Sequence, residues 1–208
     1  MDVPLIIIKK QSQRLNMLLA GLSEFVIMGA ILYALIALPK NSPAMDSIYK
    51  LALLITLFAS TLGAIKFLSD LDISKYHQIF TFLSKHVAVT AFIICAGWPL
   101  FRTKATQILA VSILISALVS LIINVFTELS LLSMGIMIFA IGFTIYSMKE
   151  NKTAMLYLSL ATGLLLSTLF WGASIKDLDT MIGVYHLCVG GFYLLAALSF
   201  KTKNGASL

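Results

Sequence analysis

The stretch that decides the fold is FVIMGAILYALIAL at residues 25–38, fourteen residues without a charged side chain. Its apolar residues do not alternate with polar ones, as they would in a strand of a membrane barrel, so the stretch is typical of a helix. About 20 mainly apolar residues, each rising about 1.5 Å, are needed to cross roughly 30 Å of hydrocarbon. Because the apolar run extends back to Leu15, residues 15–38 predict a transmembrane helix.

Six further segments have the same character. They cover residues 48–68, 79–101, 107–126, 129–148, 154–171 and 180–200. The composition agrees, since 60% of the 208 residues are hydrophobic and 12% are charged, with a mean hydropathy of +0.98. Soluble domains average about 45–50% apolar and about 25% charged residues. We therefore predict an all-α, polytopic membrane protein whose single domain is a bundle of seven transmembrane helices.

The charges and cysteines fit this class. The net charge of +6 comes from lysines and arginines spread over the short loops, where they anchor helix ends to lipid phosphates rather than bind nucleic acid. No small-residue cleavage pattern closes the first apolar run, so we expect that span to stay. Cys95 and Cys188 fall inside spans, and we predict no disulfide. Small size and bare termini indicate a bacterial inner membrane.

The polar residues inside the spans gather in the half of the bundle nearest the N-terminus. Ionisable residues in a membrane usually face the bundle interior. We therefore expect a cavity on the N-terminal side that binds a lipid or a small amphiphile. The candidate ligand-binding residues are Glu24, Ser60, Lys66, His86, Asn124, Glu128, Tyr185 and His186.

Two of these residues have structural as well as functional interpretations. Glu24 is a proton acceptor or cation ligand in one interpretation; in the other, it pairs with Lys66 or is protonated and hydrogen-bonded. His186 is either a satisfied core histidine or a group beside a notch, left by Gly190 one turn on, that could hold a small molecule. His77 is assigned to the loop or an interfacial turn, and no role is expected for it.

The fourth span carries a polar stripe in which residues recur every four positions and so share one helix face. Its members are Ser112, Ser116, Ser120, Asn124 and Glu128. The stripe is either a wet face of the cavity or a face for tight helix packing, because small hydroxyl residues let membrane helices approach and hydrogen-bond. Packing is the favoured interpretation.

Two segments carry a resemblance to a known family. The run STLGAIK at 60–66 closes the second predicted span, and VYHLCVGG at 184–191 lies near the start of the seventh. Both resemble the corresponding segments of the seven-helix membrane hydrolase superfamily, which includes alkaline ceramidases and the progestin and adiponectin receptors. The resemblance implies a seven-helix bundle with a polar site on the N-terminal side.

The same resemblance implies a zinc ion that activates water against a lipid amide or ester. Ser60 and His186 match the family's motif, but Ala64 and Gly190 stand where it has histidines, and Lys66 stands where some relatives have a metal ligand. A catalytic zinc normally has three protein ligands and a water. We therefore expect no cofactor and a metal-less relative of these hydrolases, with residual zinc-dependent hydrolysis as the enzymatic alternative.

Two other classes of function stay open. One is an accessory or structural subunit that acts through its lateral surface on other membrane subunits. The other is a small transporter, which ranks last because the sequence has neither an internal repeat nor a pair of Gly/Pro-interrupted spans. The expected partners are thus membrane lipids or other membrane subunits.

Overall fold

All regular secondary structure that the computed structural model describes is helical. The described residues are 3–37, 42–69, 71–127, 130–174 and 178–203, with side chains described for 15–37, 42–69, 71–127, 131–168 and 180–202. The helices are α1 (Val3–Ala37), α2 (Pro43–Leu68), α3 (Ser74–Leu83), the π-helix η1 (Ser84–Ala88), α4 (Val89–Ala96), the 3₁₀ turn η2 (Trp98–Leu100), α5 (Lys104–Thr127), α6 (Ser130–Ser147), α7 (Lys152–Ser174) and α8 (Leu178–Lys203). The predicted all-α class is confirmed.

Because α3, η1 and α4 follow one another without a break, the described chain forms seven helical rods, and each overlaps one predicted span. Five of them are long and apolar enough to cross a membrane. These are Leu15–Ala37, Pro43–Leu68, Ser74–Ala96, Lys104–Thr127 and Thr180–Thr202. A sixth apolar stretch, Leu131–Ser147, is shorter. The described part of the chain is therefore helical with five potential spans.

The third rod is displaced from its predicted bounds of 79–101. It begins at Ser74, whose backbone N–H donates to Asp72 Oδ1 at 3.3 Å. It ends at Ala96, because Pro99 has no N–H to donate and disfavours helical geometry at the residue before it. The last predicted turn is instead the 3₁₀ turn η2. The helix thus starts before Tyr76 and includes His77, which we had assigned to the loop or an interfacial turn.

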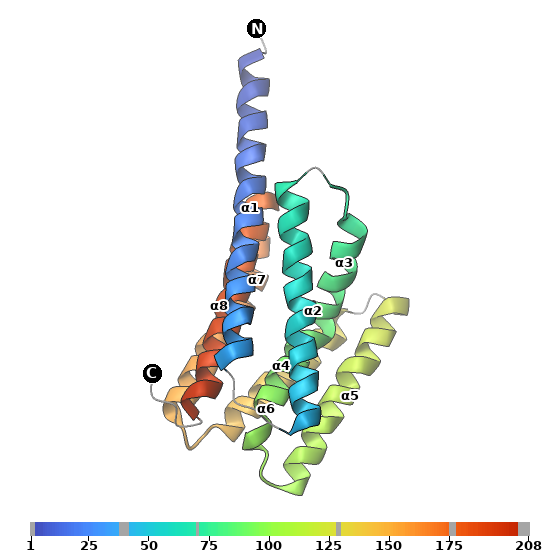
Figure 1. The fold of residues 1–208 in the computed structure, drawn as a ribbon, viewed down its shortest axis with the longest axis vertical. Coiled ribbons are helices and arrows are strands. Elements are labelled where there is room, and N and C mark those ends of the chain that lie inside the picture. The colour runs from blue at the N-terminus through green and yellow to red at the C-terminus, as the bar shows by residue number, and fades with distance from the viewer. Residues whose placement is uncertain (1–2, 38–41, 70, 128–129, 175–177, 204–208) are drawn as a thin grey trace.

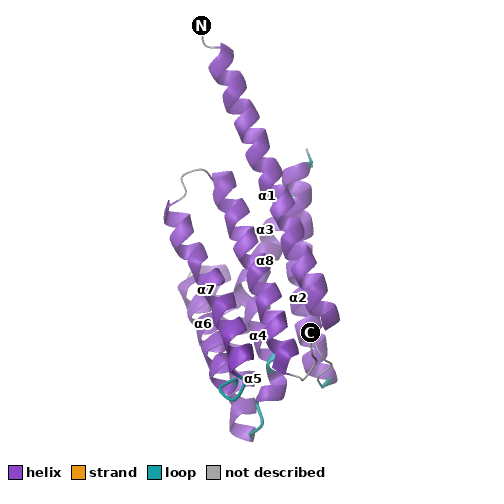
Figure 2. Cartoon of the chain, turned by 90° about the vertical axis from the view of Figure 1, so that its left-hand side faces the viewer, coloured by secondary structure: helices purple, strands orange, loops and turns teal. Residues whose placement is uncertain are grey.

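The rods lie roughly parallel, and α1 extends past the others at its N-terminal end (Figures 1 and 2). Helix α1 packs against α8 and α2, while α8 also packs against α7. Helix α2 contacts α3, η1 and α4, and α6 contacts α4, α5 and α7. The ends of α2 and α7 and the starts of α3 and α8 therefore meet on the N-terminal side of the bundle.

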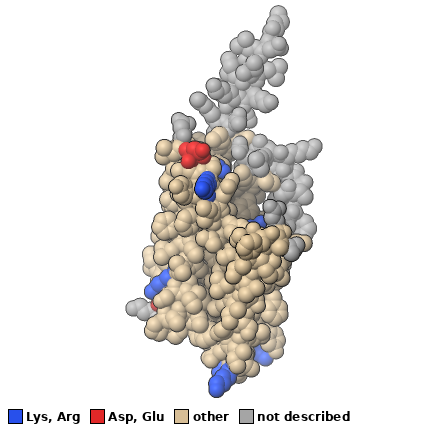
Figure 3. All heavy atoms as spheres, turned by 90° about the vertical axis from the view of Figure 1, so that its right-hand side faces the viewer, with Lys and Arg blue, Asp and Glu red and all other residues tan. Residues whose placement is uncertain are grey.

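The outer surface is rich in apolar side chains. Ile36, Phe126 and Leu131 are 85%, 82% and 70% exposed, and leucine, isoleucine and phenylalanine recur along the outside of every long helix. Few charged side chains interrupt the face drawn in Figure 3. Soluble monomers rarely expose contiguous apolar patches of such extent, so this surface matches the one that a bilayer would cover.

Candidate functional site

The described carboxyl group buried deepest in the bundle belongs to Glu24, on α1. Glu24 is 2% exposed and His186 of α8 is 8% exposed, and Glu24 Oε1 lies 3.3 Å from His186 Nε2. The Ser60 hydroxyl of α2 hydrogen-bonds to the same carboxyl group. Three helices therefore meet at one acid–base pair. Among the described residues the ion-pair partner of Glu24 is His186, whereas the sequence had suggested Lys66.

The hydrogen bonds around His186 fix how many protons the pair holds. Ser23 Oγ donates to the Ala20 carbonyl at 2.7 Å and lies 3.1 Å from His186 Nδ1. With its single proton on the Ala20 carbonyl, that hydroxyl can only accept from Nδ1–H, and we assign His186 the tautomer that meets this bond, with Nε2 facing Glu24. One further proton between Nε2 and Oε1 allows these two atoms to form a hydrogen bond. With that proton on either partner, the pair has no net charge.

Two glycines allow these helices to approach closely. A Cβ on Gly63 of α2 would lie 2.7 Å from Glu24 Cδ, so the carboxyl group rests directly on the α2 backbone. A Cβ on Gly190 of α8 would lie 2.9 Å from Val26 Cγ1 and 3.3 Å from the Ile27 backbone nitrogen. Helix α1 thus fills the notch that we had expected beside His186, and that notch does not hold a ligand.

A pocket of about 330 Å³ lies beside the acid–base pair, where α2, α3, α7 and α8 meet. Its wall consists of Lys66, Phe67, His77, Thr81, Thr168, Met181, Ile182, Tyr185 and His186. Three of the predicted residues, Lys66, Tyr185 and His186, therefore line one cavity. Glu24 contacts His186, and Ser60 in turn contacts Glu24.

His77 belongs to this pocket although no role was expected for it. It contacts the edge of Phe67, with ring centroids 6.3 Å apart and the rings nearly perpendicular. The signal in the sequence was the spacing to Thr81, because residues four apart share one face of a helix. It applies here because the helix begins at Ser74, so His77 and Thr81 belong to the same helix.

The other predicted residues form a second cluster between η1, α5 and α6. Asn124 Nδ2 lies 3.4 Å from His86 Nδ1 and donates to Ser133 Oγ, whose hydroxyl lies 3.2 Å from Ser120 Oγ. All four side chains are buried. The expected single cavity is therefore two polar clusters, and Glu128 lies outside the described residues.

The polar stripe on α5 divides in the same way. Ser120 and Asn124 are buried and hydrogen-bond toward Ser133 of α6, while Ser112 and Ser116 are exposed along a groove between the two helices. The buried half of the stripe therefore connects two helices, which agrees with the packing interpretation.

The π-helical turn η1 positions the residues between the two clusters. Ser84 Oγ lies 2.9 Å from Thr56 Oγ1, which lies 3.0 Å from the Tyr193 hydroxyl. Two residues further on, His86 faces Asn124. Such turns are rare and occur often at functional sites. The hydroxyl chain joins η1 to α2 and α8 and was not predicted, because Thr56 and Tyr193 are isolated polar residues in apolar sequence.

Replacing Ser133 with alanine should destabilise the bundle by about 1 kcal/mol, because Asn124 loses a buried acceptor. Ser147→Ala, on the same helix, is the matched control, since the Ser147 hydroxyl bonds only to the Phe143 carbonyl one turn back among the described residues. Thermal unfolding in detergent measures both. Equal midpoints for the two variants would contradict a bridging role for Ser133.

The described residues do not fit the zinc site that the family resemblance implies. His86 and His186 belong to different clusters. Over the described ranges, no three histidine, cysteine, aspartate or glutamate side chains gather closely enough to hold a metal ion. No reaction step is therefore assigned to a metal.

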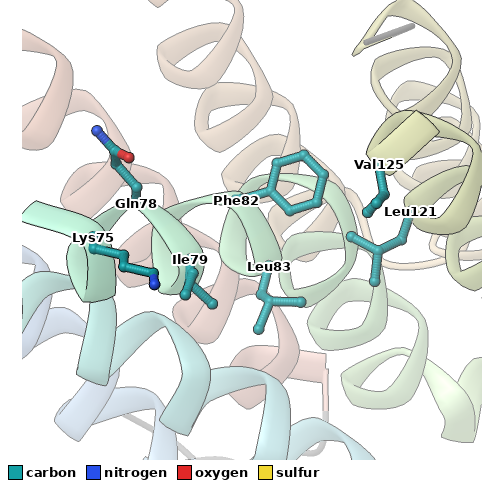
Figure 4. Close-up of a pocket in the computed structure, with 7 residues that line it drawn as sticks. All are labelled: Lys75, Gln78, Ile79, Phe82, Leu83, Leu121 and Val125. Atoms are coloured by element: carbon teal, nitrogen blue, oxygen red, sulfur yellow. The ribbon is translucent and has the colours of Figure 1, made fainter. Parts of the chain in front are cut away.

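A larger groove of about 530 Å³ lies between α3 and α5. In Figure 4 the Phe82 side chain of α3 extends toward Leu121 and Val125 of α5, with Lys75 and Gln78 nearer the start of α3. Its lining contains none of the predicted residues. It is a mainly apolar groove and not part of the candidate site.

Comparisons of the chain with protein-family models, with curated proteins and with solved structures find no match, so the functional argument depends on the geometry of the pocket and its acid–base pair.

Proposed function

We propose that the chain is an integral membrane protein that binds a lipid or a small amphiphile in the pocket between α2, α3, α7 and α8. Five helices of sufficient length and hydropathy support membrane insertion, as do the exposed apolar side chains around them. The short sixth helix and α7 complete a seven-span bundle in this proposal. A bacterial inner membrane is its proposed location.

The observation that carries the proposal is the mixed wall of the pocket. Lys66, His77 and Tyr185 offer polar atoms on the same wall as Phe67, Met181 and Ile182. An amphiphile needs polar contacts for its headgroup and apolar contacts for its tail, whereas a cavity that holds only water needs polar contacts alone. The pocket lies where helices begin and end, which is the level of the headgroups in an inserted bundle.

We also propose that the chain is a metal-less relative of the seven-helix hydrolases. Ala64 and Gly190 supply no ligand atoms where that family has histidines. Ser60, the motif's serine, hydrogen-bonds to Glu24. Binding without cleavage is the function that these residues support.

The experiment is native mass spectrometry of the full chain in mild detergent with an equimolar mixture of phosphatidylglycerol, phosphatidylethanolamine and phosphatidylcholine. We expect a bound lipid on the wild-type protein and its loss in Ile182→Trp, because the indole would fill part of the 330 Å³ pocket. The matched control is Leu187→Trp, on the same helix but 51% exposed. Equal lipid retention by both variants would contradict the proposal.

A further inference from the structure

We infer that the ligand has an anionic headgroup, a carboxylate or a phosphate, that pairs with Lys66. The inference rests on the proposed amphiphile binding and names the chemistry of the ligand. Its basis is the charge balance of the pocket wall, in which the ammonium group of Lys66 has no neighbouring counter-charge among the described residues.

The wall itself supplies no negative charge. Its nine described residues include Lys66 and two histidines but neither aspartate nor glutamate. Within the part of the chain that the structure describes, no carboxylate oxygen lies within 4 Å of Lys66 Nζ, and the ion pairs are Lys50–Asp46 and His186–Glu24. The Lys66 ammonium instead lies 5.2 Å from the ring centroid of Phe67.

Glu24 is the carboxyl group that the sequence had suggested as a partner of Lys66, but its charge is already compensated. Its Oε1 atom lies 3.3 Å from His186 Nε2, and the carboxyl group accepts a hydrogen bond from Ser60. Because the Glu24–His186 pair has no net charge, no described carboxylate balances the positive charge of Lys66. An ammonium that is only partly in water gains most from an ionised acceptor, which forms the stronger class of hydrogen bond.

The remaining polar groups of the wall suit the same anion. Tyr185 and Thr81 carry hydroxyl protons, and His77 carries a ring N–H. The Thr168 hydroxyl donates to the Leu165 carbonyl at 2.6 Å, so it is occupied. Phe67, Met181 and Ile182 then favour an anion with an alkyl tail over a free ion.

The test compares headgroups on one tail. The full chain in a neutral detergent is titrated with decanoate, decyl phosphate and decanol, and with acetate and inorganic phosphate as tail-free anions. For the wild type, we expect the two anionic amphiphiles to bind at least about tenfold tighter than decanol, and the tail-free anions to bind more weakly than their decyl counterparts.

Variants assign the selectivity to one side chain. Lys66→Gln should reduce the preference for the anion to near parity, and Lys66→Arg should keep it. Lys75→Gln is the matched control, because Lys75 lies on α3 and lines the separate groove. If the Lys66 ammonium points into water and does not contact the ligand, Lys66→Gln will bind the anionic decyl compounds with the same preference over decanol as the wild type. That result would overturn the inference.

The outcomes separate the inference from the proposed function. Equal binding of all three decyl compounds, blocked by Ile182→Trp, overturns the anionic headgroup and leaves amphiphile binding intact. No binding of any decyl compound overturns both. Inorganic phosphate binding as tightly as decyl phosphate supports the anion site but contradicts an amphiphile. The wild-type series decides between these outcomes even if Lys66→Gln does not fold.

Discussion

Gly63→Ala is expected to lower the free energy of unfolding by about 1–3 kcal/mol, although alanine is the better helix former. The added Cβ would lie 2.7 Å from Glu24 Cδ and 3.2 Å from His77 Nε2. Glu24 cannot move aside freely, because it is also held by His186 and Ser60. The loss therefore reflects displacement of the acid–base pair from α2.

The matched controls for Gly63 are Gly29→Ala and Gly142→Ala, since a Cβ at either position meets no described atom within 4 Å. Each should be neutral or should stabilise its helix by about 0.5–1 kcal/mol. Thermal unfolding in one detergent measures all three variants. A Gly63→Ala midpoint equal to those of the controls would mean that the carboxyl group does not rest on α2.

Most of the fold could be predicted from the sequence because long apolar runs have few alternatives to helices. Each of the seven predicted segments overlaps a helical rod, and the errors lie at the ends, as for the third rod. There, the helix starts at Ser74, whose backbone N–H donates to the Asp72 side chain, a capping residue that the sequence offers ahead of the apolar run. Hydropathy does not record such bonds.

The sequence predicted which residues belong to the candidate site, but not which of them contact one another across helices. Spacing along one helix placed Ser120 and Asn124 on a common face, and they do share a cluster. Partners on different helices, such as Glu24 with His186, depend on helix rotation and on the close approach that Gly63 and Gly190 allow. A single sequence gives no measure of that rotation, so the sequence suggested Lys66 as the partner of Glu24 and did not suggest His186.

Glu24→Met is expected to cost about 3 kcal/mol of stability, because it leaves His186 Nε2 and the Ser60 hydroxyl buried without their shared hydrogen-bond partner. His186→Phe should cost less, since a protonated Glu24 keeps its bond to Ser60. Each single variant destroys one side of the pair. The size of either loss alone does not show that the two groups act together.

The double variant Glu24→Met/His186→Phe isolates their interaction. When both polar groups are gone, the ring nitrogen of His186 is no longer left without a partner and only the Ser60 hydroxyl is, so the combined loss should fall short of the sum by about 1–3 kcal/mol. The control cycle combines Glu24→Met with Ser133→Ala, which belongs to the other cluster, and should be additive within about 0.5 kcal/mol. Both cycles are measured as unfolding free energies in the same mixed micelles. Additivity in the first cycle would separate Glu24 from His186 and remove the neutral pair that leaves Lys66 free to bind an anion.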